Sequence, residues 1–134
     1  MYICEHFKIH ELVPQQVYQD RGEKAWELLD ERLLITLDQL RKRYGPMTIN
    51  NYYWQGDREW SGLRTKDSPY YSPYSQHSFG RAADCLFKKL SAEEVRQNIL
   101  QYQNEFPEIN SVELGVSWLH FDVRNCNRIK TYYP

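Results

Sequence analysis

The chain of 134 residues lacks the features that mark several large classes of protein. Its 17 Lys and Arg are balanced by 18 Asp and Glu, so it carries no basic footprint for nucleic acid or for an anionic membrane. No apolar run approaches the roughly 20 residues that a helix needs to span a bilayer. The N-terminus lacks the basic segment and apolar stretch of a secretory signal. We therefore predict a protein that is cytoplasmic at synthesis, with neither nucleic acid nor a membrane as its partner.

Cysteine is also scarce, and its positions are irregular. Cys4, Cys85 and Cys126 are odd in number and widely spaced, and no CxxC pair indicates a zinc ribbon or a redox couple. We expect them to be reduced, small apolar residues in a chain that folds in a reducing compartment.

The first fifty residues are predicted to be mainly helical. Pro14 suits the first turn of a short helix, and a longer helix is expected from Glu23 to Tyr44, before Gly45 and Pro46. Its apolar residues recur at intervals of three and four, as in an amphipathic helix. These residues are Ala25, Trp26, Leu29, Leu33, Leu37 and Leu40.

The rest of the chain alternates between strand-like and loop-like segments. Met47 to Trp54 is β-branched and aromatic and predicts a strand, whereas 55–74 is a long loop of the kind that usually serves function. Ser91 and Glu94 form a capping box that opens a second helix, and apolar alternation predicts strands within 111–133. The length fits one domain, residues 1–134, since two domains would each be poorly stabilised.

Two of the four histidines lie in settings typical of a metal site. Asp84 follows His77 by seven residues, and the small Gly80 between them allows the backbone to turn closely. His120 and Asp122 lie two apart in a predicted strand, so both point to the same face. Two imidazoles and one carboxylate are a ligand set for catalytic zinc, which keeps a fourth position open. A His–Asp hydrogen bond without metal is the alternative.

Two stretches of sequence resemble known signatures. Residues 75–84, SQHSFGRAAD, resemble the SxHxxGxAxD signature of peptidase family M15, and residues 118–124, WLHFDVR, resemble the HxDxR ending of its phage-type branch. This family comprises zinc D-alanyl-D-alanine carboxypeptidases and phage endopeptidases that cut peptidoglycan peptides. The resemblance implies a small α+β fold, an antiparallel sheet with helices packed on one side as in hedgehog-type zinc domains. It also implies that His77, Asp84 and His120 bind Zn²⁺.

The resemblance implies how substrate is held as well. The family uses an Arg within a Ser-Gly-Tyr-Arg-like element to hold the substrate's carboxylate, and Ser61-Gly62-Leu63-Arg64 matches that element. A competing alignment places Tyr53 there instead. We favour Arg64, because a planar guanidinium can bind a carboxylate through two hydrogen bonds. Further candidates for substrate binding are Ser75 of the signature and two loop tyrosines, Tyr70 and Tyr74, for which loop packing is the alternative role.

The family's catalytic acid is missing. Members place Glu or Asp three residues before the last zinc His, but Ser117 stands there, and serine cannot accept a proton near neutral pH. The candidates for the general base are Asp122, on the strand face of His120, and Glu113. Glu113 reaches the metal only if residues 115–117 form a turn, and Asp122 has the alternative role of orienting a ligand imidazole.

The sequence therefore predicts a zinc peptidase that cleaves peptidoglycan stem or cross-bridge peptides, as a D-Ala-D-Ala carboxypeptidase or an endolysin. We expect it to be phage-encoded and to act at the cell wall or within the virion. The alternative, which Ser117 favours, is a virion structural or interaction protein that binds other virion proteins and keeps the fold and zinc site with weak or no activity. A purely structural zinc would need a fourth ligand, for which Cys85 is a candidate.

Overall fold

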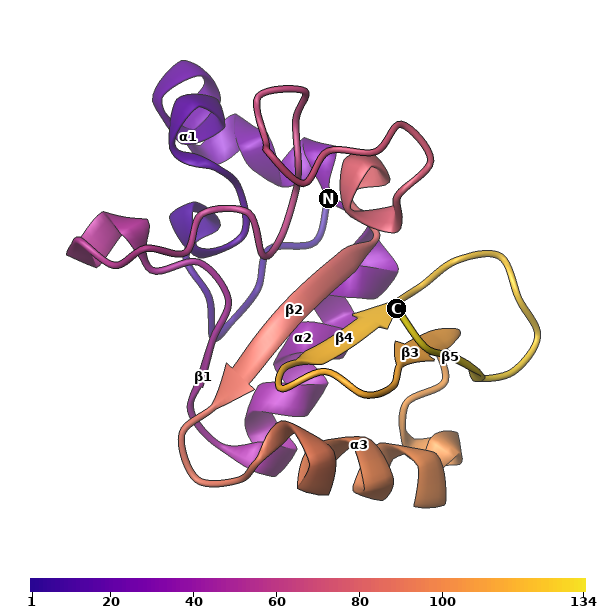
Figure 1. Ribbon diagram of the computed structural model, residues 1–134. Coiled ribbons are helices and arrows are strands. Elements are labelled where there is room, and N and C mark those ends of the chain that lie inside the picture. Colours follow the sequence, from indigo (N-terminus) through magenta and orange to yellow (C-terminus); the bar gives the residue numbers. More distant parts are fainter.

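Five strands form one sheet, in the order β1-β2-β4-β3-β5, in the computed structural model, which describes residues 1–134 (Figure 1). The strands are β1 (Met47–Thr48), β2 (Ala82–Phe87), β3 (Ser111–Glu113), β4 (Leu119–Asp122) and β5 (Lys130–Tyr132). Every pair is antiparallel except β3 with β5, because the chain reverses after β4 and returns on the far side of β3. The expected α+β class is confirmed, and this parallel edge pair is its one departure from an antiparallel sheet.

Three α-helices and five short 3₁₀ turns complete the fold. The helices are α1 (Gln15–Arg21), α2 (Glu31–Tyr44) and α3 (Ala92–Gln101). The 3₁₀ turns are η1 (Ile9–Glu11), η2 (Gly22–Leu28), η3 (Tyr52–Trp54), η4 (Gln76–Phe79) and η5 (Gln103–Glu105). The capping box expected at Ser91 and Glu94 begins α3, and residues 55–74 contain no helix or strand. No helix is both long and apolar enough to cross a membrane.

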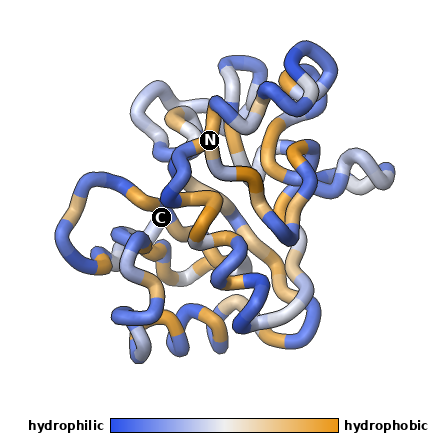
Figure 2. Tube along the Cα trace, turned by 180° about the vertical axis from the view of Figure 1, so that it is seen from behind, coloured by the Kyte–Doolittle hydropathy of each residue, from blue (hydrophilic) through white to orange (hydrophobic).

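The hydrophobic core lies between one face of the sheet and the helices. Successive strand residues point to opposite faces, so β2 directs Ala83 and Cys85 into the core, and β4 directs Leu119 and Phe121 there. Helix α2 lies behind the sheet and α3 runs beneath it in Figure 1. Figure 2 shows hydrophobic segments through the middle of the molecule and hydrophilic ones in its outer loops. The other sheet face is therefore free to carry polar groups.

The long helix expected from Glu23 to Tyr44 is interrupted. All six residues of its apolar stripe are buried, but the chain turns at Leu29 and Asp30, and only residues after Asp30 are α-helical. The Asp30 side chain accepts a hydrogen bond from the Arg32 backbone N–H and so caps α2, while its own N–H donates to the Gly80 carbonyl. A contact distant in sequence therefore ends the first segment, which helical periodicity cannot reveal.

The strand expected from Met47 to Trp54 is wrong beyond Thr48. Asn50 is buried, and its side chain donates to the Val13 carbonyl and accepts from the Ser61 N–H, which pulls the chain out of the sheet. Asparagine side chains that bond to backbone groups compete with strand pairing in this way. The residues that follow form η3 instead.

Cys4 and Cys85 are buried, as expected of small apolar residues, whereas Cys126 is partly exposed. All three are free thiols.

Replacement of Gly80 should destabilise the fold through a clash with the backbone. The φ of Gly80 is +68°, and a Cβ there would lie 2.2 Å from the Leu28 carbonyl oxygen. We expect Gly80→Ala to lower the free energy of unfolding by more than the roughly 1–2 kcal/mol that left-handed backbone costs other residues, because the clash adds to it. Gly115→Ala is the matched control, since that glycine also has a positive φ but faces only the side chain of exposed Tyr133. The free energy of unfolding can be measured for both variants in urea. An equal decrease in the two would contradict this account.

Candidate metal centre

Four strands place polar side chains in one row across the open face of the sheet. Asp84 of β2 is paired with His120 of β4. Strands β3 and β4 pair Ser111 with Asp122 and Val112 with Phe121. The same register, continued by one residue, places Glu113 opposite His120. On its other side, Glu113 is paired with Tyr132 of β5. Directly opposed residues point to the same face, with Cβ atoms about 4.5–5.5 Å apart. The sheet register therefore builds the row Asp84, His120, Glu113 and Tyr132.

The turn η4 supplies His77, the ligand that does not come from the sheet. The Ser75 hydroxyl accepts a hydrogen bond from the His77 N–H and caps the turn, and Gly80 ends it in the left-handed conformation. The His77 carbonyl accepts from the Arg64 N–H at 3.1 Å, so the turn is fixed to the preceding loop. Ser75 and Gly80 therefore shape the turn that carries His77.

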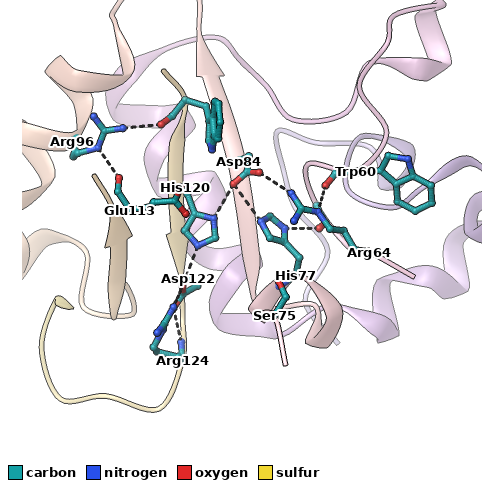
Figure 3. Close-up of polar contacts among 12 residues, drawn as sticks. Trp60, Arg64, Ser75, His77, Asp84, Arg96, Glu113, His120, Asp122 and Arg124 are labelled. Atoms are coloured by element: carbon teal, nitrogen blue, oxygen red, sulfur yellow. Dashed lines mark hydrogen bonds and ion pairs between the residues drawn. The ribbon is translucent and has the colours of Figure 1, made fainter. Parts of the chain in front are cut away.

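His77, Asp84 and His120 form a buried group that could hold a metal ion (Figure 3). Their donor atoms lie within 4.8 Å of one another. Asp84 Oδ1 is 3.3 Å from His77 Nε2 and 2.8 Å from His120 Nδ1. Tetrahedral zinc with bonds of 2.0–2.2 Å separates its ligand atoms by about 3.3 Å, so only a small movement is needed to admit the ion.

Each imidazole is held so that one nitrogen remains for the metal. His77 Nδ1 is 2.8 Å from the Gly62 carbonyl, which leaves Nε2 directed at Asp84. His120 Nε2 is 3.1 Å from Asp122 Oδ2, which leaves Nδ1 directed at Asp84. Metal-binding histidines typically use the second nitrogen in such a bond to a carbonyl or carboxylate, which fixes the tautomer and the ring.

The protonation states of Asp84 and His120 follow from the same contacts. Burial alone would raise the pKa of Asp84, but hydrogen bonds from His120 and His77 outweigh it and hold that pKa well below its usual range. Burial would lower the pKa of His120, yet its hydrogen bonds to Asp122 and Asp84 raise it to about 9. A metal ion that binds at Nδ1 therefore displaces a proton from His120.

Arg64 lies directly against this group. Its Nη2 donates to Asp84 Oδ2 at 3.1 Å and its Nε to the Trp60 carbonyl at 2.7 Å, and its guanidinium lies 5.6 Å from the centre of the Tyr70 ring. Tyr53, which the competing alignment would place here, instead stacks on His10. Of these two residues, Arg64 is therefore the one that lies beside the candidate metal ligands.

A cavity of about 250 Å³ opens onto His77 and His120, two of the three candidate metal ligands. Nine residues line it: Arg64, Tyr74, Ser75, Gln76, His77, Glu113, His120, Arg124 and Tyr132. Tyr70 lines a neighbouring cavity with Arg64, while Asp122 and Ser117 line neither. The structure thus brings most of the expected site residues to one cavity.

Three cavity residues, Gln76, Arg124 and Tyr132, have no role in the sequence prediction. Arg124 belongs to the HxDxR motif, so a signal for it existed. No sequence signal pointed to Tyr132, because its position beside the cavity depends on the parallel pairing of β5 with β3.

The two candidate general bases differ in their surroundings. Residues 114–118 connect β3 to the antiparallel β4, so the turn that Glu113 required is present. Glu113 is half-buried and lines the cavity, and its carboxylate shares no hydrogen bond or ion pair with Arg64 or Arg124. Asp122 is fully buried and is bound to His120 and to Arg124. Burial opposes ionisation of Asp122, but hydrogen bonds from Arg124 and His120 lower its pKa.

Cys85, the candidate fourth ligand, points into the hydrophobic core on the opposite face of the sheet. The group that could hold a metal ion therefore contains three side chains, His77, Asp84 and His120. Comparison of the chain with protein-family models, curated proteins and solved structures finds no match.

Loss of one imidazole should abolish tight metal binding. Two protein ligands hold zinc poorly against water, so we expect His77→Ala to lose most of the zinc that the wild-type protein retains after dialysis. His6→Ala is the control, because the His6 side chain pairs with exposed Glu5 and lies outside the group, and its backbone hydrogen bond to Asp38 does not need the imidazole. The measurement is the zinc content per chain by mass spectrometry. Undiminished zinc in His77→Ala would refute the assignment of His77 as a ligand.

Proposed function

We propose that the protein is a zinc-dependent peptidase that cleaves peptides of peptidoglycan. The observation that carries this proposal is the arrangement of three buried donors, two imidazoles and a carboxylate, beside a cavity that also exposes a carboxylate. Catalytic zinc sites typically have three protein ligands and one open position, whereas structural sites have four. The two motifs that resemble the peptidase family supply the substrate class.

A zinc ion held by His77, Asp84 and His120 would supply Lewis-acid chemistry, since zinc lowers the pKa of water to about 7 and polarises a carbonyl. The protein's own residues keep the ligands in place. Asp122 orients His120, the Gly62 carbonyl orients His77, and Arg64 binds the second oxygen of Asp84. Such outer contacts keep each ligand atom aimed at one point before the ion arrives.

Glu113 is the better candidate for the general base. A general base must lie within hydrogen-bond reach of the proton that it removes, and Glu113 faces His120 across the strand pair and lines the cavity. Asp122 lies beneath His120, with both oxygens bound by Arg124. We therefore assign proton transfer to Glu113 and the positioning of His120 to Asp122, which reverses the order expected from the strand pattern alone.

The direct test of this function is hydrolysis by the zinc-loaded protein. We expect release of amino groups or of D-Ala from purified peptidoglycan and synthetic stem peptides, with loss of activity on chelation and recovery on addition of zinc. His77→Ala serves as the inactive control. Absence of cleavage by fully zinc-loaded protein on both kinds of substrate would contradict the proposal.

The roles of the two carboxylates can be separated by comparing two variants. Glu113→Gln keeps shape and removes the base, so we expect hydrolysis to fall about 10²–10⁴-fold while zinc binding is unchanged. Asp122→Asn should instead weaken zinc binding by about 10–100-fold, and excess zinc should restore much of its activity. The measurements are zinc affinity by titration and hydrolysis at saturating zinc. Normal hydrolysis by Glu113→Gln would exclude it as the base.

A second candidate, an interaction protein of the virion, is favoured by exposed aromatic side chains away from the cavity. Tyr53 and Trp54 of η3 are 50% and 57% exposed, and neither lines the cavity on the metal. Aromatic residues are common anchors of protein interfaces. Zinc-loaded protein that shows no hydrolysis, but binds a virion protein through these residues, would support this function over the peptidase.

A further inference from the structure

Arg124 presents a fixed guanidinium to the cavity wall. Its Nε and Nη2 donate to the two oxygens of Asp122, each at 2.7 Å, and Asp122 is fully buried, whereas the Arg124 side chain is 28% exposed. Its Nη1 makes no hydrogen bond in the structure. A guanidinium that is held along one edge and free at its other end is preorganised to bind a carboxylate.

The ring of Tyr132 lies beside this guanidinium. The guanidinium carbon of Arg124 lies 5.4 Å from the centre of the Tyr132 ring, and the ring packs edge-on to His120 with centroids 6.1 Å apart. A tyrosine hydroxyl can donate a hydrogen bond to a carboxylate. Both side chains line the cavity that opens onto the metal ligands.

The charges around the cavity favour an anionic ligand. Arg64 is paired with Asp84, and Arg124 with Asp122, so these four charges balance. Glu113 is then the remaining carboxylate on the wall, and its single charge does not offset that of a bound divalent cation. A metal-loaded cavity is therefore positive and attracts a carboxylate.

Arg64 and Arg124 lie on opposite sides of the metal ligands (Figure 3). Arg64 contacts Asp84 and the Trp60 carbonyl, so two of its nitrogens already serve to hold a metal ligand and the loop. We propose that Arg124 and Tyr132 form a subsite for a carboxylate of the peptide substrate, on the β5 side of the metal site. This inference rests on the proposed function, and it assigns the recognition of that carboxylate to Arg124 and Tyr132 rather than to Arg64.

The test uses ligand binding rather than hydrolysis. N-acetyl-D-alanine and its carboxamide differ in one carboxylate, and their affinities for the full-length protein can be measured by NMR titration with and without zinc. We expect the acid to bind more tightly than the amide in both states, because its hydrogen bonds to Arg124 and Tyr132 do not need the ion, and by a larger factor with zinc, because only the metal-loaded cavity is positive. Tyr132→Phe removes only the hydroxyl, and we expect it to reduce this preference about tenfold, as for loss of a hydrogen bond to a charged group. Tyr133→Phe is the control, because Tyr133 is 73% exposed and does not line the cavity.

Equal affinities for the acid and the amide would overturn the subsite. So would a preference for the acid that disappears without zinc. A preference for the acid that survives Tyr132→Phe but is lost in Arg64→Lys would overturn it as well. Arg124→Lys should weaken binding of the acid in the zinc-free protein, where any effect on the metal ligands is absent. Because none of these measurements depends on turnover, an inactive protein would refute the proposed function without deciding the subsite.

Discussion

The register between β2 and β4 is the constraint on which the whole site depends. It pairs Asp84 with His120 on the open face of the sheet. A slip of one residue would turn every side chain to the other face, sending Asp84 into the core and bringing Cys85 out of it. The apolar residues on the core side, such as Phe121, are fully buried, so hydrophobic burial holds the register that the metal ligands need.

Oppositely charged partners beside the cavity offset the cost of burying the carboxylates of Asp84 and Asp122. Asp84 lies between Arg64 and the two imidazoles, and Asp122 lies between His120 and Arg124. A buried carboxylate without such partners would be strongly destabilising, and a pair broken by mutation leaves its other member uncompensated. The arginines therefore stabilise the fold and hold the ligands at the same time, which leaves Glu113 as the carboxylate available to a substrate.

The parts of this structure that follow local rules could be predicted from the sequence. Strand alternation placed His120 and Asp122 on one face, and the spacing of His77 and Asp84 around Gly80 predicted a close turn. The α+β class followed from the same patterns.

The errors arose where a distant contact decides the structure. The helix break at Asp30 depends on a hydrogen bond to the Gly80 carbonyl, and the end of β1 depends on the bonds that Asn50 makes to Val13 and Ser61. Tyr132 reaches the site only through parallel pairing of β5 with β3, which strand periodicity does not specify. Each of these contacts joins segments far apart in sequence, so none leaves a periodic signal in the chain.

The central claim is that one zinc ion binds at the meeting point of η4, β2 and β4. The most direct measurement is a crystal structure of the zinc-loaded protein with anomalous data at the zinc edge. We expect one strong peak about 2.0–2.2 Å from His77 Nε2, Asp84 Oδ1 and His120 Nδ1, with Glu113 facing its open side. A peak bound through other residues, a fourth protein ligand, or no peak at full zinc loading would contradict the account.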